Sequence, residues 1–399
     1  MTSLAGLKVL ELARVLAGPW AGQVLADLGA DVVKVESPDG DDTRGWGPPF
    51  VDHSDGGADA AYFHATNRGK RSIAIDFRSV DGQAIVRALA RRSDVLIENF
   101  KVGGLRRFGL DYQSLRAENP RLVYCSISGF GQDGPYAHRA GYDFIIQAMG
   151  GIMDLTGAAD GEPQKSGVAF ADIFTGLYAT IAIEAALIAR ERTGEGQHID
   201  MALLDTQVGV LANQAMNYLV SGRAPRRMGN AHPNIVPYQT FPAADGDIIL
   251  TIGNDGQFAR FCEVAGRPEW ASDERYATNA ARVANRDTLI PALRQTTVMK
   301  TTAEWLRLLE EAGVPGGPVN TIEQVFQDPQ VQHRGLRIDL SHPLTKSVPL
   351  VGSPLRLSGS PVRYASAPPL LGEHTGDVLS QVLGLDAAAI EQLRRDGVI

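Results

Sequence analysis

The first half of the chain alternates between short apolar runs and amphipathic stretches. Apolar runs at 7–12, 31–36, 72–77, 94–98 and 122–127 predict strands, and the periodic stretches at 20–28, 80–92 and 103–117 predict helices. Alternating strands and helices indicate an α/β fold with a parallel, doubly wound, Rossmann-like sheet. No G-x-G-x-x-G motif follows the first strand, so we do not expect a nicotinamide or flavin dinucleotide.

Each predicted strand is followed by a loop at its carboxyl end. In open parallel sheets, ligands bind at those ends of the strands. The segments Val15–Gly18, Asn99-Phe100 and Ser128–Gly131 can therefore share one site.

An aspartate precedes the longest apolar helix of the chain. Residues 166–171 lead to Asp172, and the predicted helix runs from there to about Arg192. An N-cap aspartate accepts backbone N–H bonds at the positive end of the helix dipole. We therefore predict that Asp172 is the N-cap and is ionised at neutral pH. A purely structural cap is the alternative that the residues alone leave open.

The pattern predicts a large domain, a small domain and two linkers. Residues 1–205 form the N-terminal part of the large domain, and the basic segment around Arg223–Arg227 lies in a linker at 206–230. A smaller α+β domain follows at 231–326. A second linker at 327–350 leads to residues 351–399, which return to the large domain.

The composition is that of a globular protein with moderate negative charge. The chain has 399 residues, with 38 basic and 46 acidic side chains, for a net charge of −8. That balance argues against nucleic acid as a partner. Two cysteines cannot form a disulfide framework, and Glu184 interrupts the apolar helix after Asp172. We therefore expect a cytoplasmic protein without a membrane segment.

Other candidate chemistry is weak. The eight histidines are scattered, so no metal site is predicted. Cys125 lies within a predicted strand and is interpreted as a buried structural thiol. Cations at 68–71, Arg78, 106–107 and Arg139 can hold phosphates, although solvated surface is the simpler interpretation for each.

Several motifs, taken in order, resemble the family III CoA-transferases, the group that includes formyl-CoA transferase and carnitine CoA-transferase. The resemblance runs from about Leu7 to the C-terminus. It rests on the segments 17–19, 25–36, 67–72, 98–100, 141–143, 171–176, 193–197, 229–234, 253–255 and 372–375.

The resemblance implies that Asp172 is the catalytic nucleophile. Its carboxylate attacks an acyl-CoA thioester to give an aspartyl anhydride, and the thiolate then converts the anhydride to an aspartyl-CoA thioester. An acceptor acid reverses these steps. The family's glycine loop closes over the site, and the matching residues here are Gly253, Asn254, Asp255, Gly256 and Gln257.

The resemblance also implies a set of coenzyme A contacts, with no permanently bound cofactor. They fall on Val15, Leu16, Ala17, Ile75, Arg78, Asn99, Phe100, Lys101, Arg107, Arg139, Tyr142 and Asp143. Ser37 stands where formyl-CoA transferase has an arginine, and Leu16 replaces its glutamine beside the acyl group. Oxalate and formate are therefore disfavoured as substrates.

The family's homodimers resemble two linked rings, and two linkers around a middle domain permit that topology here. A 2-methylacyl-CoA racemase is the alternative activity, but Tyr142 stands at the position of its histidine base, and a phenol is a poor base at neutral pH. A non-catalytic CoA-binding protein is the third possibility. The sequence does not identify the donor and acceptor acids; succinyl-CoA with a short dicarboxylate is a hypothesis.

Overall fold

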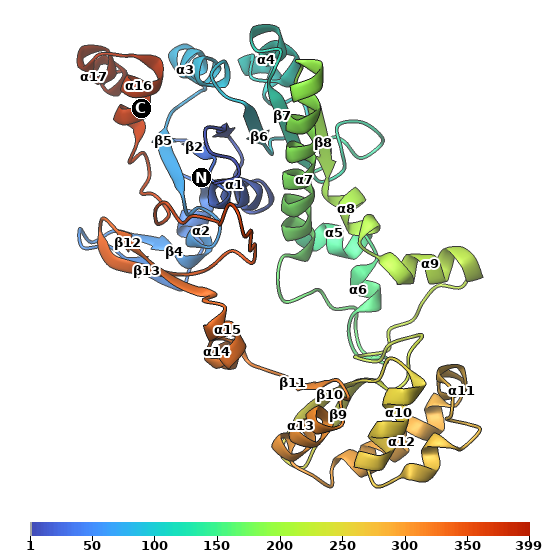
Figure 1. The fold of residues 1–399 in the computed structure, drawn as a ribbon. Helices are drawn as coiled ribbons and strands as arrows, with labels where there is room; N and C mark the ends of the chain where they lie inside the picture. The colour runs from blue at the N-terminus through green and yellow to red at the C-terminus, as the bar shows by residue number, and fades with distance from the viewer. Residues whose placement is uncertain (1) are drawn as a thin grey trace. The chain divides into compact units, whose positions relative to one another are not determined.

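The computed structural model describes residues 2–399 and divides into two compact units (Figure 1). The first contains the chain up to Ile152, Ser166–Met216 and Gln330–Ile399. The second contains Met153–Lys165 and Asn217–Pro329.

A six-stranded parallel sheet with the order β5-β2-β1-β6-β7-β8 forms the centre of the first unit. Its strands are β1 (Lys8–Glu11), β2 (Asp31–Glu36), β5 (Lys70–Ala74), β6 (Val95–Glu98), β7 (Val123–Ser128) and β8 (His198–Ala202). The strand order reverses at β1, which pairs with β2 on one side and β6 on the other. Such a switch point is where open α/β sheets bind ligands, so the loop after β1 lies at the expected place.

Helices cover both faces of this sheet. The helices that cover it are α1 (Ala17–Asp27), α3 (Val80–Ala90), α4 (Tyr112–Glu118), α7 (Phe170–Thr193), α8 (Leu203–Gly209), α16 (Thr375–Leu383) and α17 (Ala387–Arg395); the same unit contains α2 (Ala61–His64) and α5 (Asp143–Met149). The core between the sheet, α1 and α7 contains Val9 and Ile97, whereas Leu10 and Leu96 face the core under α3, α4, α16 and α17. Successive strand residues thus alternate between two buried faces, which is why these strands read as continuous apolar runs.

A glycine allows α7 to lie close against α1. A Cβ added at Gly176 would meet the carbonyl oxygen of Ala17 at 2.7 Å and the Cβ of Trp20 at 3.0 Å. Gly176 lies one turn after Asp172, so this contact fixes the start of α7 beside the start of α1.

Two hairpins and several short elements complete the first unit. They are β3 (Phe50–Asp52) with β4 (Ala58–Ala60), β12 (Arg337–His342) with β13 (Thr345–Val351), and the 3₁₀ turns at Asp42–Gly45 and Arg106–Phe108. Three helices lie at or near the boundaries between the units: α6 (Ile152–Leu155), α9 (Ala212–Ser221) and α15 (Pro329–His333).

The second unit is a small α+β structure around an antiparallel sheet with the order β11-β10-β9. Its strands are β9 (Tyr238–Pro242), β10 (Asp247–Thr251) and β11 (Gly316–Pro318). Its helices are α10 (Asp255–Val264), α11 (Asn279–Ala284), α12 (Arg286–Thr297), α13 (Thr302–Glu311) and α14 (Ile322–Gln327), with a 3₁₀ turn at Pro268–Ala271. Its core includes Phe258, Phe261 and Trp305.

The observed units differ from the predicted boundaries in three places. The predicted linker at 327–350 contains β12 and most of β13, so the prediction of a linker is wrong there. The predicted linker from residue 206 begins within α8 and contains α9, with Ala212 at a φ of 46° where α9 begins. Residues 153–165 belong to the second unit, although they precede its main segment by fifty residues or so in the sequence.

α7 is the one helix of residues 2–399 that is long and apolar enough to cross a membrane by length and composition. Core helices of soluble proteins pass the same test. Here α7 packs against α1, α8, β7 and β8, as expected for a helix of a globular core.

Candidate active site

Asp172 lies in the first turn of α7 but does not cap it. The helix begins at Phe170, and Ala169 occupies the N-cap position without a side-chain cap. The Asp143 carboxylate on α5 takes that role, because its Oδ1 accepts hydrogen bonds from the backbone N–H groups of Ala171 (2.8 Å) and Asp172 (3.2 Å). The prediction of an N-cap at Asp172 is therefore wrong: a residue distant in sequence satisfies the free N–H groups.

The Asp172 carboxylate has no hydrogen-bond donor paired with it within residues 2–399. Burial, and after it the nearby Asp143 charge, raise the pKa of Asp172 to about 7. The residue still keeps some contact with solvent. We predicted an ionised Asp172 at neutral pH; desolvation and the like charge of Asp143 oppose that ionisation more strongly than the helix dipole favours it, so near pH 7 the carboxylate is partly protonated.

A buried glutamine holds the surroundings of this carboxylate in place. Gln147 on α5 is 0% exposed; its amide donates to Asp143 Oδ2 at 2.7 Å and accepts from the backbone N–H of Ser166 at 2.9 Å. The start of α5 and the segment leading into α7 are thus joined, which fixes the position of Asp143 relative to Asp172.

Two aromatic residues near the site were not predicted. Burial, followed by the charges of Asp172, Asp143 and Asp41, raises the pKa of Tyr62 to about 12, so this phenol lies within the field of all three carboxylates. Trp46 packs edge-on against Tyr62 with ring centroids 5.4 Å apart. The sequence does mark this region, because both residues lie in or just after a long loop after β2 that is rich in glycine and proline. Long loops of this kind are usually functional.

The loop between β1 and α1 presents backbone groups at the switch point. α1 begins at Ala17 without a side-chain cap or an acidic residue in its first turn, an arrangement that favours an anionic ligand. Leu16 and Ala17 are buried, and Val15 is half-buried. The Asn99 amide holds this loop from the end of β6, because it accepts from the N–H of Arg14 (2.9 Å) and donates to its C=O (2.7 Å).

The remaining predicted coenzyme A contacts lie in different environments. Ile75 is 0% exposed in the sheet core, so its side chain is not accessible to a ligand, and the coenzyme A contact at this residue stays a prediction. The Arg78 guanidinium pairs with Asp76 at 2.8 Å, so that cation already has a counter-ion. Phe100 packs edge-on against Phe77, with centroids 5.8 Å apart.

Three further cations and a phenol are exposed. Arg107 lies over the Phe108 ring at 4.5 Å, and Arg139 lies over the Tyr136 ring at 4.3 Å. Lys101 and Tyr142 are also exposed, with Tyr142 at the N-cap position of α5.

A cavity of about 350 Å³ lies within the first unit, beside the loop after β6. Glu98, Lys101, Arg106, Ser126 and His198 are among the residues that line it. Burial raises the pKa of Glu98 to about 7, although the Ser126 hydroxyl and the backbone N–H of Phe100 bind its carboxylate. Of the predicted coenzyme A residues, only Lys101 lines this cavity.

The second unit contains the predicted active-site loop. Asn254 caps α10 by accepting from the backbone N–H of Gln257 at 2.9 Å, and the Gln257 side chain accepts from the N–H of Gly253 at 2.8 Å. Asp255, Gly256 and Gln257, which the resemblance assigns to the glycine loop, therefore form the first turn of a helix. The role of these residues in closing over the site stays a prediction.

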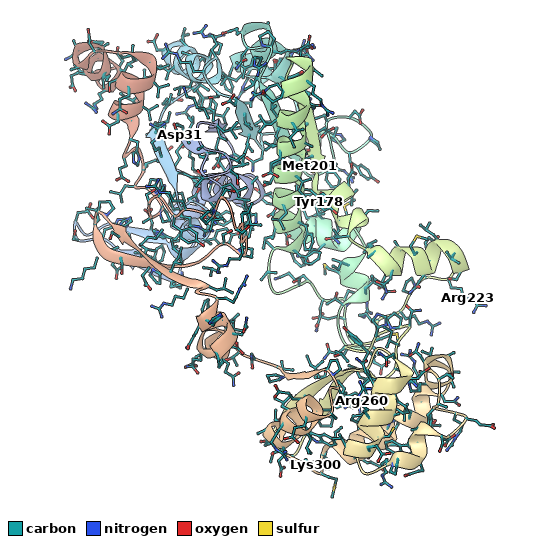
Figure 2. The ribbon with its side chains drawn as sticks, viewed as in Figure 1. Asp31, Tyr178, Met201, Arg223, Arg260 and Lys300 are labelled. Atoms are coloured by element: carbon teal, nitrogen blue, oxygen red, sulfur yellow. The ribbon has the colours of Figure 1, made fainter. Side chains whose placement is uncertain are left out.

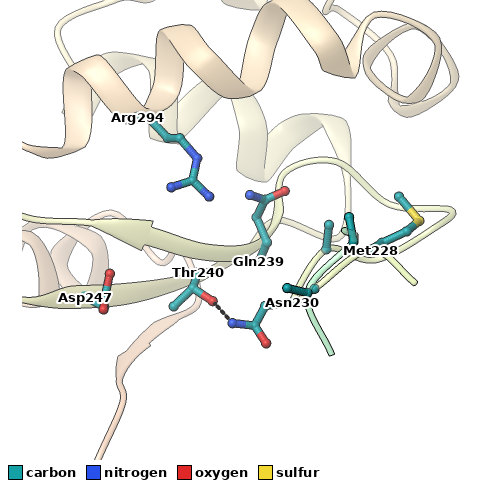
Figure 3. Close-up of a pocket in the computed structure, with 10 residues that line it drawn as sticks. Met228, Asn230, Gln239, Thr240, Asp247 and Arg294 are labelled. Carbon is teal, nitrogen blue, oxygen red and sulfur yellow. Dashed lines mark hydrogen bonds between the residues drawn. The ribbon is translucent and has the colours of Figure 1, made fainter. Parts of the chain in front are cut away.

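A second cavity of about 350 Å³ lies wholly within this unit. Figure 3 shows the Arg294 guanidinium from α12 and the Gln239 amide from β9 pointing toward each other across it. Asn230, which donates to Thr240, and Asp247 are on the same lining. The cavity thus combines one cation, one carboxylate and neutral polar groups.

Residues 2–399 contain no group of three or more His, Cys, Asp or Glu side chains that could hold a metal ion. Cys125 and Cys262 are free and buried. Burial raises the pKa of the Cys125 thiol above its usual range, so this cysteine is unsuited to act as a nucleophile at neutral pH.

Comparison with known proteins identifies the family. The sequence profile of CoA-transferase family III matches residues 4–375. The chain is 58% identical to the succinate–glutarate CoA-transferase of Agrobacterium fabrum, over 97% of both chains. It is 45% identical to the succinyl-CoA:glutarate CoA-transferase of Mus musculus, over 100% of this chain and 91% of the relative.

A solved structure has the same fold. A CAIB/BAIF family protein from Brucella suis superimposes with a TM-score of 0.86 at 60% identity, covering 96% of this chain and 99% of that one. The curated relatives are named as transferases, which favours transfer over racemisation or simple binding. The match over nearly the whole length shows that the chain belongs to CoA-transferase family III and is a CoA-transferase that uses CoA thioesters as substrates.

Proposed function

We propose that the protein moves coenzyme A from an acyl-CoA to a free carboxylic acid through covalent intermediates on Asp172. One observation carries this proposal: a carboxylate without a hydrogen-bond donor stands in the first turn of α7, and its backbone is held by Asp143. Burial raises the pKa of Asp172 to about 7, which makes its anion a stronger base and nucleophile than a solvated aspartate.

The proposed steps balance without a cofactor. The Asp172 carboxylate attacks the thioester carbonyl, the C–S bond breaks, and an aspartyl anhydride and a CoA thiolate form. The thiolate attacks the aspartyl carbonyl of the anhydride, releasing the donor acid and leaving Asp172 as its CoA thioester. The acceptor carboxylate then attacks this thioester, and the second anhydride is cleaved by the thiolate to give the new acyl-CoA and free Asp172.

Tyr62 fits a role in holding charge during these steps. Its raised pKa keeps the phenol protonated, so it can donate a hydrogen bond near the Asp172 carboxylate. Water must also be excluded, because anhydrides hydrolyse. We assign that task to the segment Gly253–Gln257, whose glycines and short helix-capping contacts suit a segment that approaches a substrate.

For substrates we propose succinyl-CoA as a donor and a short dicarboxylate such as glutarate as an acceptor. The support is the printed activity of the two curated relatives, at 58% and 45% identity. For coenzyme A we propose the α1 N-terminus, the Val15–Ala17 segment and the cations Lys101 and Arg107 as contacts, because the first turn of α1 has no side-chain cap on its N–H groups and the two cations add positive charge.

We further propose a cytoplasmic homodimer in which the two chains interlock. The outward face of α7 exposes Leu177, Tyr178, Ile181 and Ile188, with exposed fractions from 39% to 65% (Tyr178 is labelled in Figure 2). Phe144, Ile145 and Met149 on α5 are exposed in the same way. An apolar surface of this size on a core helix favours burial against a second copy of the chain.

Trapping the covalent intermediate tests the mechanism. The enzyme is incubated with succinyl-CoA, treated with hydroxylamine or borohydride, digested and analysed by mass spectrometry. We expect a modification on the peptide that contains Asp172 and none when acyl-CoA is omitted. Transfer to glutarate without any modification at Asp172 would contradict the covalent route. A panel of acyl-CoA donors and carboxylic acids, assayed in parallel, identifies the substrates.

A further inference from the structure

The loop after β1 contains a residue in an unfavourable backbone conformation. Val15 has a φ of 71°, and the only other non-glycine residue with positive φ in the described part of the chain is Ala212. Valine is β-branched, so the left-handed region is a true outlier for it. Such a conformation persists only where surrounding contacts enforce it, and it concentrates at functional sites.

The Asp41 carboxylate is one such contact. Both of its oxygens accept from the backbone N–H of Val15, at 3.4 and 3.3 Å. Asp41 is buried and is itself fixed by the N–H and hydroxyl of Thr43, at 3.0 and 2.8 Å. The Asn99 side chain binds the backbone N–H and C=O of Arg14, the residue before Val15. Consecutive residues of the loop are therefore held by side-chain hydrogen bonds.

A buried lysine connects Asp41 to the same loop. The Lys34 ammonium pairs with Asp41 at 2.9 Å and donates to the carbonyl oxygen of Ala13 at 2.8 Å. It also pairs with Glu11 at 3.2 Å, and Glu11 pairs with Lys70 at 2.8 Å; the Lys34, Lys70, Glu11 and Asp41 side chains in these pairs are 0% exposed. Buried charges of this kind add little net stability, so their position around one loop calls for another explanation.

We propose that Asp41 is a positioning residue for coenzyme A: its carboxylate, held by Lys34, keeps Val15 left-handed and so fixes the Arg14–Ala17 segment in the form that receives the coenzyme. This inference rests on the proposed function, which places coenzyme A at that segment. Asp41 does not itself need to touch the substrate. The feature that matters is that its carboxylate oxygens accept from the backbone N–H of Val15.

A double-mutant cycle tests the proposal in the full-length protein, with free coenzyme A as the probe. We expect Asp41→Asn to weaken coenzyme A binding by about tenfold or more. The change turns one of the two acceptor oxygens into an NH2 group and removes the ion pair with Lys34, so the Val15 N–H is no longer held and the loop leaves its binding conformation. In the Val15→Gly background the same change should cost less than about threefold, because glycine adopts positive φ without help. Equal losses in both backgrounds, or no loss in either, would overturn the proposal.

Asp41→Asn removes one negative charge from this buried cluster, and the release of one proton can compensate for it. Burial lowers the pKa of Lys70 to about 8, against the opposing effect of Glu11, so Lys70 can release its proton. Measurements at pH 8 therefore favour a folded variant. Asp27→Asn is the matched control, since it removes an equally buried ion pair with Arg68 that does not touch the loop. It should lower the melting temperature and leave coenzyme A affinity unchanged within about twofold.

The outcomes separate this proposal from the proposed function. If the wild-type protein fails to bind coenzyme A or to transfer it, the proposed function is wrong. The four proteins of the cycle can then be compared by their free energies of unfolding. Asp41→Asn should again lower this free energy less in the Val15→Gly background than in the wild type. Absence of that coupling would show that Asp41 does not hold Val15. In active enzyme, the KM for acyl-CoA should rise more than kcat falls.

Discussion

Asp143 and Asp172 form the central relationship of the site: the carboxylate of the first accepts a 3.2 Å hydrogen bond from the backbone N–H of the second. The same carboxylate also contributes to the raised pKa of Asp172, after burial. Asp143 therefore both positions the proposed nucleophile and weakens its acidity, two effects that substitutions can separate.

Asp143→Asn should shift the acid limb of kcat/KM to lower pH. In the proposed mechanism ionised Asp172 is the active form, so kcat/KM should rise with pH through about 7 in the wild type. Loss of the neighbouring charge lowers the pKa of Asp172, and we expect a shift of about half a unit to one unit, since burial, the larger cause, remains. An amide oxygen can still accept from the two N–H groups, while the new NH2 group replaces the oxygen that accepts from Gln147. A pH–rate profile with saturating acceptor measures the shift.

Asp143→Ala is the control, because it removes both the charge and the acceptor. We expect the same direction of shift together with a loss of kcat of about tenfold or more, since the start of α7 loses its cap. If the pH–rate profile shifts in neither variant, the Asp143 charge does not affect the pKa of Asp172.

Asp172→Asn should abolish transfer and stabilise the fold at high pH. Turnover should fall by at least about a thousandfold, because an amide cannot form the covalent intermediates. The folded-state pKa of about 7 lies above the unfolded value, so the folded state binds the extra proton between about pH 4 and 7 and loses stability as pH rises. Above pH 7 the folded wild type bears the full free-energy cost of burying the ionised Asp172 carboxylate, and the Asn variant does not.

Thermal unfolding at two pH values checks this sign. We expect the Asn variant to melt about 2 °C or more above the wild type at pH 8 and at nearly the same temperature at pH 4. A variant that is less stable than the wild type at pH 8 would show that the ionised carboxylate is stabilised by its surroundings.

The sequence predicted the parts of the fold that depend on local pattern. Strand residues such as Val9 and Leu10 face two different cores, and a run that is buried on both faces is easily recognised. The hairpin β12–β13 was missed because its burial alternates and residues such as Arg337 and Asp339 are exposed, so its segment resembled a polar linker.

The sequence indicated Asp172 as the candidate nucleophile but did not indicate its electrostatic environment. Asp172 was found from the helix that follows it and from the family motif. Its cap and its raised pKa depend on Asp143, which lies 29 residues earlier, and on burial by elements that no local pattern connects. Tyr62 and Asp41 were missed for the same reason, since only the folded chain brings them near Val15 and Asp172.

Gly176→Ala should disturb the contact between α1 and α7. The added methyl group would lie 2.7 Å from the Ala17 carbonyl oxygen, so the helices must separate. We expect a loss of about 1–3 kcal/mol in the free energy of unfolding, together with reduced coenzyme A binding. Gly209→Ala in α8 is the matched control, because nothing lies within 4 Å of the added methyl group, and it should be neutral or slightly stabilising. Chemical denaturation compares the two, and equal effects would argue against close packing at Gly176.

The exposed face of α7 leads to the last prediction, Ile188→Asp. Ile188 is 65% exposed, and we proposed above that a second copy of the chain covers this face. A charge buried at such an interface is costly, so the variant should shift from dimer to monomer in sedimentation at micromolar concentration. Val80→Asp on α3 is the control, since Val80 is 76% exposed on another helix and an acidic residue suits a helix start. It should leave the sedimenting mass unchanged.

A wild-type protein that sediments as a monomer would overturn the dimer proposal. An interlocked dimer should dissociate in the Ile188 variant only slowly, because the chains must partly unfold to separate.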